Sequence, residues 1–150
     1  MVTVTELRSD DVELVDSRLP LNRLDQHSAG ASTYLIAWDG EEPVGHAHLA
    51  WSGTHLQLPE IQDMFVLPEL RGRGIGTTLV HAAEQAARDR GWGRMSLSVS
   101  RDGNPSARRL YEGLGYADAG VEPVRTVGVI QLRGRPFHVD DTLLYLTKAL

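Results

Sequence analysis

Three glycines at alternate positions, Gly72, Gly74 and Gly76, lie where a strand-like run gives way to a helical run. Glycine lets the main chain approach a bound anion closely, because it has no Cβ atom. The unpaired N–H groups and the positive dipole end of the helix that follows also attract negative charge. The spacing therefore predicts a phosphate-binding turn and a phosphorylated ligand.

Two other phosphate motifs do not fit this turn. A dinucleotide fingerprint needs G-x-G-x-x-G and an acidic residue about 20 positions later. Here the glycines run G-x-G-x-G, and the next expected strand, 95–99, is followed by Ser100 rather than by an acidic residue. A Walker A loop needs Gly-Lys-Ser/Thr, whereas here Thr77 follows Ile75 and Gly76. These mismatches exclude a Rossmann dinucleotide site and a P-loop triphosphatase.

Hydrophobic periodicity predicts the elements that position the turn. Strands are expected at 2–7, 34–38, 44–51, 56–66, 95–99, 127–132, 137–139 and 142–147, with hairpin turns at 39–40 and 133–136. Helices are expected from residue 12 to before Pro20, at 77–91, and from Pro105 with Asn104 as its cap; 21–30 is expected to be a short helix and a loop. The pattern predicts an α+β fold with a mixed, mostly antiparallel sheet and helices on both faces.

Composition narrows the class of protein. The chain has 150 residues, 41% of them hydrophobic and 23% charged, which suits one domain over residues 1–150. We expect no membrane segment and no signal peptide, and so a cytoplasmic location. The net charge of −5 argues against nucleic-acid binding and favours a cationic acceptor. The absence of cysteine excludes disulfides, thiolate metal sites and a cysteine nucleophile.

Two sequence blocks resemble the GCN5-related N-acetyltransferase (GNAT) superfamily. The pyrophosphate signature Q/R-x-x-G-x-G/A is matched by Arg71, Gly74 and Gly76, after the typical lead-in 66–70. The second block, N-x-x-A-x-x-L-Y-x-x-x-G-F, is matched by Asn104, Ala107, Leu110, Tyr111 and Gly115, with Tyr116 in place of phenylalanine. The two blocks occur in the family's order and spacing. The resemblance implies a GNAT-like fold that uses acetyl-CoA and no metal.

The resemblance also assigns residues to the cofactor and to the leaving group. The cofactor-binding residues that it implies are Met64, Phe65, Val66, Arg71, Gly72, Arg73, Gly74, Ile75, Gly76, Thr77 and Asn104. The pantetheine arm is expected to lie along Met64–Val66 like an extra strand, with the N–H of Met64 directed at the thioester oxygen. Tyr111 is expected to be the general acid that protonates the departing thiolate. A core tyrosine on a helix stripe is the alternative interpretation.

The general base is less clearly indicated. Many relatives carry a glutamate two residues before the position of Met64, whereas this chain has Gln62, which cannot accept a proton. Regular strand alternation places Glu60 on the face of Gln62 and Asp63 on the opposite face, so Glu60 is the preferred base. His46 and His48, on the neighbouring strand, are expected to be structural or solvent-facing, with a catalytic role as the alternative.

These observations favour an acetyl-CoA-dependent N-acetyltransferase in which the acceptor attacks the thioester directly within a ternary complex. The expected acceptor is a small-molecule amine, then a peptide N-terminus, then a lysine side chain. Members of the family are often dimers, so the resemblance allows a homodimer, whereas the residues themselves do not indicate the oligomeric state. A catalytically silent acyl-CoA sensor or partner module is the alternative function. Gln62 favours the silent module, and Tyr111 favours catalysis.

Overall fold

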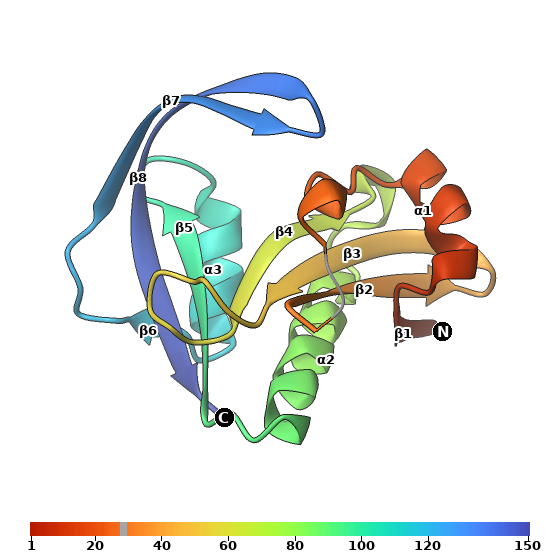
Figure 1. The fold of residues 1–150 in the computed structure, drawn as a ribbon. Helices are drawn as coiled ribbons and strands as arrows, with labels where there is room; N and C mark the ends of the chain where they lie inside the picture. Colours follow the sequence, from red (N-terminus) through yellow and green to blue (C-terminus); the bar gives the residue numbers. More distant parts are fainter. Residues whose placement is uncertain (28–29) are drawn as a thin grey trace.

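The computed structural model describes residues 1–27 and 30–150. Its strands are β1 (Val2–Glu6), β2 (Ser32–Asp39), β3 (Glu42–Ala50), β4 (Glu60–Val66), β5 (Arg94–Ser100), β6 (Ala117–Asp118), β7 (Val124–Leu132) and β8 (Arg135–Ala149). They form one sheet in the order β1-β2-β3-β4-β5-β8-β6, and β7 pairs with β8 (Figure 1). Only the pairing of β4 with β5 is parallel among these strands. The expected mixed, mostly antiparallel sheet is confirmed.

Three α-helices pack on this sheet: α1 (Val12–Arg18), α2 (Ile75–Asp89) and α3 (Pro105–Gly113), with short 3-10 turns η1 (Ser9–Asp11), η2 (Leu24–Gln26) and η3 (Pro68–Leu70). Successive side chains of β2 point to opposite faces of the sheet, and each face packs in a different hydrophobic core. Leu35 and Ala37 pack in the core that contains α2 and Tyr111 of α3. Tyr34 and Ile36 pack in a second core with Val15 of α1. Helices therefore cover both faces, as expected.

Some boundaries differ from the expected ones. β4 begins at Glu60 rather than residue 56, because Gln57 turns the chain with φ 57° and Thr54 Oγ1 donates to Leu58 O across 2.6 Å. The two strands expected at 137–139 and 142–147 are one continuous strand, β8. Asp140 and Asp141 interrupt its hydrophobic pattern without interrupting its pairing with β7. Of the helix and loop expected at 21–30, η2 is present, and residues 28–29 lie outside the described residues.

The sheet opens between β4 and β5. These strands pair only at Glu60 with Ser96 and at Ile61 with Leu97. Beyond this point they lead apart, and Figure 1 shows β4 turning toward β3 while β5 stays beside β8 and α3. The edge of β4 that faces β5 is therefore free of strand pairing from residue 62 onward. An unpaired inner edge of this kind can accept an extended ligand.

Tyr116, which stands in place of the phenylalanine of the second sequence block, has a structural role. Tyr116 is 2% exposed, and its hydroxyl donates to Glu84 of α2 across 2.9 Å. Lys148 of β8 also donates to Glu84, across 3.0 Å. A phenylalanine here would leave the buried carboxylate of Glu84 with one donor fewer. The tyrosine therefore belongs to a buried polar link between α2 and β8.

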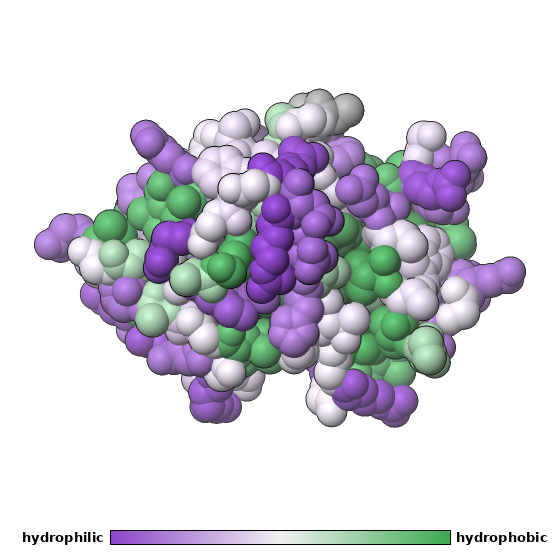
Figure 2. Space-filling model, turned by 90° about the horizontal axis from the view of Figure 1, so that it is seen from below, coloured by the Kyte–Doolittle hydropathy of each residue, from purple (hydrophilic) through white to green (hydrophobic). Residues whose placement is uncertain are grey.

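Figure 2 shows a face of the molecule on which hydrophilic and hydrophobic residues are interspersed. Hydrophobic residues there form small separate areas among hydrophilic ones. None of the helices in the described part of the chain is long and apolar enough to cross a membrane.

Candidate active site

The glycine turn between β4 and α2 has the geometry expected for binding an anion. Gly72 and Gly74 have φ of 79° and 83°, which side chains with a Cβ rarely adopt. Gly74 is the N-cap residue of α2, and a Cβ added to it would meet no heavy atom within 4 Å. The N-terminus of α2 therefore opens on free space. Its N–H groups and dipole favour an anion there.

A groove of about 640 Å³ runs from this turn along the end of β4 to α3. The predicted cofactor-binding residues that line it are Met64, Phe65, Val66, Arg71, Gly72, Gly74, Ile75, Gly76, Thr77 and Asn104. Arg73 is exposed and does not line the groove. The structure thus brings together every residue of the predicted set except Arg73.

Arg71 and Asn104 make bonds that fix the two ends of the groove. The Nε of Arg71 donates to Val66 O across 2.9 Å, and its guanidinium lies 5.4 Å from the centre of the Phe65 ring. Asn104 Oδ1 accepts the N–H groups of Ser106 and Ala107, across 3.0 and 3.3 Å. Asn104 is therefore the N-cap of α3, as predicted. Its contact with a cofactor stays a prediction.

A bulge on β4 divides the side chains of this strand between the two faces of the sheet. Gln62 pairs with His48 and Phe65 with His46, so Asp63 and Met64 together face one residue of β3. Asp63 has φ 45° at this bulge. Its Oδ2 accepts from the Tyr34 hydroxyl across 2.5 Å and from the Asn22 N–H across 3.1 Å.

The expected position of Asp63 on the face opposite Gln62 is therefore wrong. That expectation assumed a regular pleat, and the bulge turns Asp63 to the face that carries Gln62, Tyr34 and η2. Met64 points the other way, toward α3. The bulge thereby separates a polar face from the Met64 side chain.

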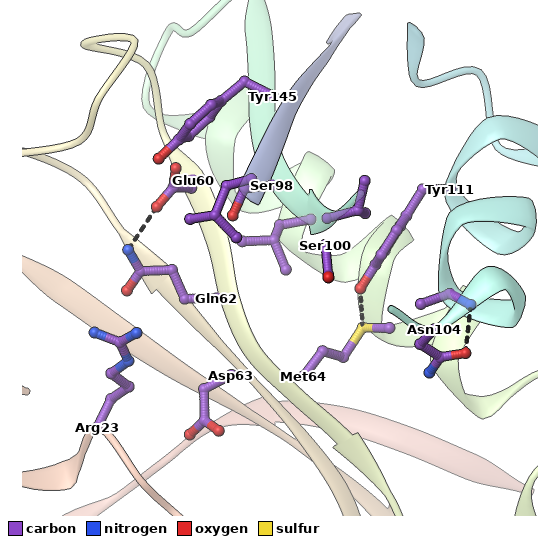
Figure 3. Close-up of a pocket in the computed structure, with 14 residues that line it drawn as sticks. Arg23, Glu60, Gln62, Asp63, Met64, Ser98, Ser100, Asn104, Tyr111 and Tyr145 are labelled. Atoms are coloured by element: carbon purple, nitrogen blue, oxygen red, sulfur yellow. Dashed lines mark hydrogen bonds between the residues drawn. The ribbon is translucent and has the colours of Figure 1, made fainter. Parts of the chain in front are cut away.

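Tyr111 lies where the groove meets a second cavity. Its hydroxyl donates to Met64 Sδ across 3.8 Å, and its side chain is buried (Figure 3). Burial raises the pKa of Tyr111 to about 12, so the phenol is protonated at neutral pH. The tyrosine lines both the groove and the second cavity. It is part of the core, and its hydroxyl also reaches the site.

The second cavity, of about 390 Å³, opens where β4 and β5 part. Its polar lining comes from Arg23, Glu60, Gln62, Asp63, Ser98, Ser100, Asn104 and Tyr145 (Figure 3). The sulfur of Met64, which also lines the cavity, is a weak hydrogen-bond acceptor. The polar side chains of the lining, in contrast, include a cationic group, acidic groups and several hydroxyl groups. The cavity is small and polar, and suits a small charged molecule.

Glu60 and Gln62 share a face of β4, as expected. Gln62 Nε2 donates to Glu60 Oε2 across 2.6 Å, and Gln62 Oε1 lies 3.2 Å from His48 Nδ1. This arrangement requires the N–H of His48 on Nδ1. The other oxygen of Glu60, Oε1, is buried and has no hydrogen-bond partner among the described residues. Gln62 therefore orients the carboxylate of Glu60 and leaves its Oε1 able to accept a hydrogen bond.

His46 and His48 are buried rather than solvent-facing, so that part of the expectation is wrong. His46 Nε2 lies 3.1 Å from Pro20 O, and its ring stacks with Phe65 at 5.8 Å. Burial lowers the pKa of both histidines, which are neutral at neutral pH. Burial and these contacts favour the expected structural role. In the described part of the chain, no group of three or more His, Cys, Asp or Glu residues could hold a metal.

Several residues of the cavity, among them Arg23 and Tyr145, were not identified from the sequence, and Asp63 was placed on the wrong face. Arg23 immediately precedes η2, and no sequence motif marks it. Tyr145 lies on β8, and its contribution depends on the pairing of β8 with β5. Asp63 reaches the cavity because of the bulge, for which the sequence carries no clear signal.

Comparison with protein families gives one match over most of the chain. The model described as the acetyltransferase (GNAT) family matches residues 2–116. Among curated proteins, the chain is similar to a thialysine N-ε-acetyltransferase of Caenorhabditis elegans, with 33% identity over 56% of this chain and 53% of that protein. It is also similar to a mycothiol acetyltransferase of Rhodococcus erythropolis, with 28% identity over 79% of this chain and 34% of that protein. The chain thus spans about half, or less, of these relatives.

Solved structures share the fold at low sequence identity. The ribosomal-protein-S18-alanine N-acetyltransferase from Escherichia coli has a TM-score of 0.73 at 16% identity, over 99% of this chain and 94% of that one. A GNAT family acetyltransferase from Elizabethkingia anophelis with acetyl-CoA bound has a TM-score of 0.71 at 16% identity, over 99% and 98%. These similarities extend over the whole described architecture, including the strands after residue 116.

Proposed function

Because the chain belongs to the acetyltransferase (GNAT) family, we propose that it is an N-acetyltransferase that moves an acetyl group from acetyl-CoA directly to an amine. One observation carries this proposal. Met64, Asn104, Ala107 and Tyr111 line both the groove of the glycine turn and the polar cavity. A thioester in the groove and an amine in the cavity would meet at these residues.

Acetyl-CoA fits the groove on two counts. The open N-terminus of α2 beyond Gly74 suits the diphosphate, because a Cβ-free turn and unpaired N–H groups face that space. The unpaired edge of β4 suits the pantetheine arm, whose amides can bond to main-chain groups of Met64–Val66. A related fold is described with acetyl-CoA bound, which supports the same cosubstrate here.

The side chains around the meeting point support a direct transfer. Glu60, itself or through a water, accepts a proton from the acceptor ammonium. The neutral nitrogen then attacks the thioester carbon, and the N–H of Met64 stabilises the oxygen that gains charge. As the carbon–sulfur bond breaks, Tyr111 donates its hydroxyl proton to the thiolate. The acetylated nitrogen loses its second proton, which returns the phenolate of Tyr111 to the phenol, directly or through a water. With no cysteine in the chain, no acetyl-thiol enzyme intermediate forms.

The proposed acceptor is a small-molecule amine, ahead of a peptide N-terminus or a lysine side chain. The small cavity supports this order, and so do relatives named for thialysine, mycothiol and streptothricin. The single domain over residues 1–150, the homodimer and the cytoplasmic location stay predictions.

Acceptor-dependent release of the CoA thiol tests the proposal. The protein is mixed with acetyl-CoA and each member of an amine panel, and thiol release is followed alongside mass spectrometry of the acetylated amine. The proposal requires thiol release that depends on an amine, with one acetylated product per thiol. Acetyl-CoA binding without amine-dependent release would instead support the silent module that Gln62, in place of a glutamate, favours.

A further inference from the structure

Arg23 and Glu60 place opposite charges on one cavity without neutralising each other. Both line the polar cavity, and Figure 3 shows them on the same side of β4 with Gln62 between them. Among the described residues, no carboxylate lies within 4.0 Å of the Arg23 guanidinium. Its Nη1 donates to Gln26 Oε1 across 3.0 Å, a neutral partner. Two charges are thus left for a ligand to match.

Glu60 supplies the negative end of this pair. It is 8% exposed, and its Oε1 has no donor in the part of the chain that the structure describes. A buried carboxylate oxygen without a donor is costly, and in native proteins it usually meets a ligand or a water. An ammonium group fits this oxygen in both charge and hydrogen bonding.

Arg23 supplies the positive end, and its main chain is anchored. The N–H of Arg23 donates to the Tyr34 hydroxyl across 2.8 Å, and the adjacent N–H of Asn22 donates to Asp63 across 3.1 Å. Arg23 is therefore held beside the cavity by the network that fixes the β4 bulge. A guanidinium in this position suits a carboxylate, which it can bind through two parallel hydrogen bonds.

Asp63 also lines the cavity, but it is less available to a ligand than Glu60, because its carboxylate already accepts hydrogen bonds from Tyr34 and Asn22. The groups of the cavity that remain available to a charged ligand are therefore the carboxylate of Glu60, through its Oε1, and the guanidinium of Arg23. We propose that the preferred acceptor carries a carboxylate in addition to its amine, as an amino acid does. Its amine lies at Glu60 and its carboxylate lies at Arg23. This inference rests on the proposed acetyl transfer and specifies the class of acceptor.

The test uses pairs of acceptors that differ only in the carboxylate. Lysine is compared with lysinamide, and β-alanine with β-alaninamide, and kcat/KM is expressed per neutral amine because amidation lowers the pKa of a nearby amine. Wild-type protein is expected to favour the acid in at least one pair by about tenfold or more, the effect of one charge-assisted hydrogen bond. Arg23→Gln is expected to reduce that preference to within about twofold, through a higher KM for the acid.

Two further variants make the outcome decisive. Arg23→Lys keeps the charge but not the paired geometry, and should retain part of the preference. Arg18→Gln removes an exposed arginine that pairs with Glu42 and does not line the cavity, and should leave the preference unchanged. Equal rates for acid and amide in both pairs with wild-type protein, or a preference that survives in Arg23→Gln, would overturn the inference. Absence of transfer to any amine would instead overturn the proposed function.

Discussion

The hydroxyl of Tyr34 donates to the carboxylate of Asp63 across 2.5 Å and so ties the middle of β2 to the bulge on β4. The same carboxylate accepts the N–H of Asn22, next to Arg23. One side chain therefore fixes both the strand that turns Met64 toward Tyr111 and the segment that carries Arg23. The two substrate regions of the site depend on a shared support.

Removing the Tyr34 hydroxyl should destabilise the fold. Tyr34→Phe leaves the partly buried Asp63 with one donor fewer, and should lower the free energy of unfolding by about 1–3 kcal/mol. Urea denaturation measures the change. Tyr145→Phe is the control, because the Tyr145 hydroxyl has no hydrogen-bond partner among the described residues, and it should change stability by less than about 0.5 kcal/mol. Equal losses in the two variants would contradict a supporting role for the Tyr34–Asp63 bond.

Cofactor binding should depend on the glycine at the start of α2. Gly74→Val places a branched side chain in the open space before the helix and should weaken acetyl-CoA binding severely. Because Gly74 has φ 83°, the variant also strains the backbone. Gly91 at the other end of α2 has φ 84°, so Gly91→Val reproduces the strain far from the groove. Calorimetry should show lost affinity in Gly74→Val alone; unchanged affinity there would contradict the assignment of the groove.

Much of this site could be predicted from the sequence, because its main parts are local. The turn from Arg71 to Thr77 carries its own conformational signal in glycines that adopt positive φ. The cap at Asn104 and the helix stripe that contains Tyr111 are also set by neighbours within a few residues. Such features depend on short-range chemistry, which a single sequence displays.

The rest depended on contacts between distant residues. The bulge at Asp63 is stabilised by Tyr34 and Asn22, 29 and 41 positions away, so alternation along β4 gave the wrong face. The role of Arg23 follows from the same contacts. The continuity of β8 through Asp140 and Asp141 depends on pairing with β7, which the hydrophobic pattern of one strand does not reveal.

Stability should fall in mild acid because of buried neutral histidines. Burial lowers the pKa of His48 below its ordinary value of 6.5, so the unfolded chain binds protons more readily than the folded protein. The folded state should therefore lose stability as the pH falls below about 6.5. When the pH falls from 7.5 to 5.5, the free energy of unfolding should decrease in both proteins. The decrease should be smaller in His48→Gln than in wild type, by up to about 1.4 kcal/mol. Urea denaturation at both pH values checks this; a loss in His48→Gln equal to that of wild type would contradict it.

Glu60 is predicted to assist deprotonation of the acceptor. Glu60→Gln removes the basic oxygen and should lower kcat/KM near neutral pH, with recovery as the pH rises and free amine becomes available. Asp63→Asn tests the neighbouring carboxylate, which the bulge brings to the same face but which Tyr34 and Asn22 already occupy. It should have the milder effect. A damaging Asp63→Asn with a silent Glu60→Gln would transfer the role of base to Asp63.

Turnover of Tyr111→Phe tests the central claim most directly, because this residue is where the two cavities meet. The change keeps the buried ring and removes the hydroxyl, whose partner in the structure, Met64 Sδ, is a weak acceptor. Tyr116→Phe is the matched control. The Tyr116 ring lies next to that of Tyr111, and this change removes a buried hydrogen bond from the Tyr116 hydroxyl to Glu84. We expect kcat to fall by ~10²–10⁴ in Tyr111→Phe, with little change in unfolding free energy or acetyl-CoA affinity. A kcat within about twofold of wild type, together with a loss of stability like that of Tyr116→Phe, would contradict the account.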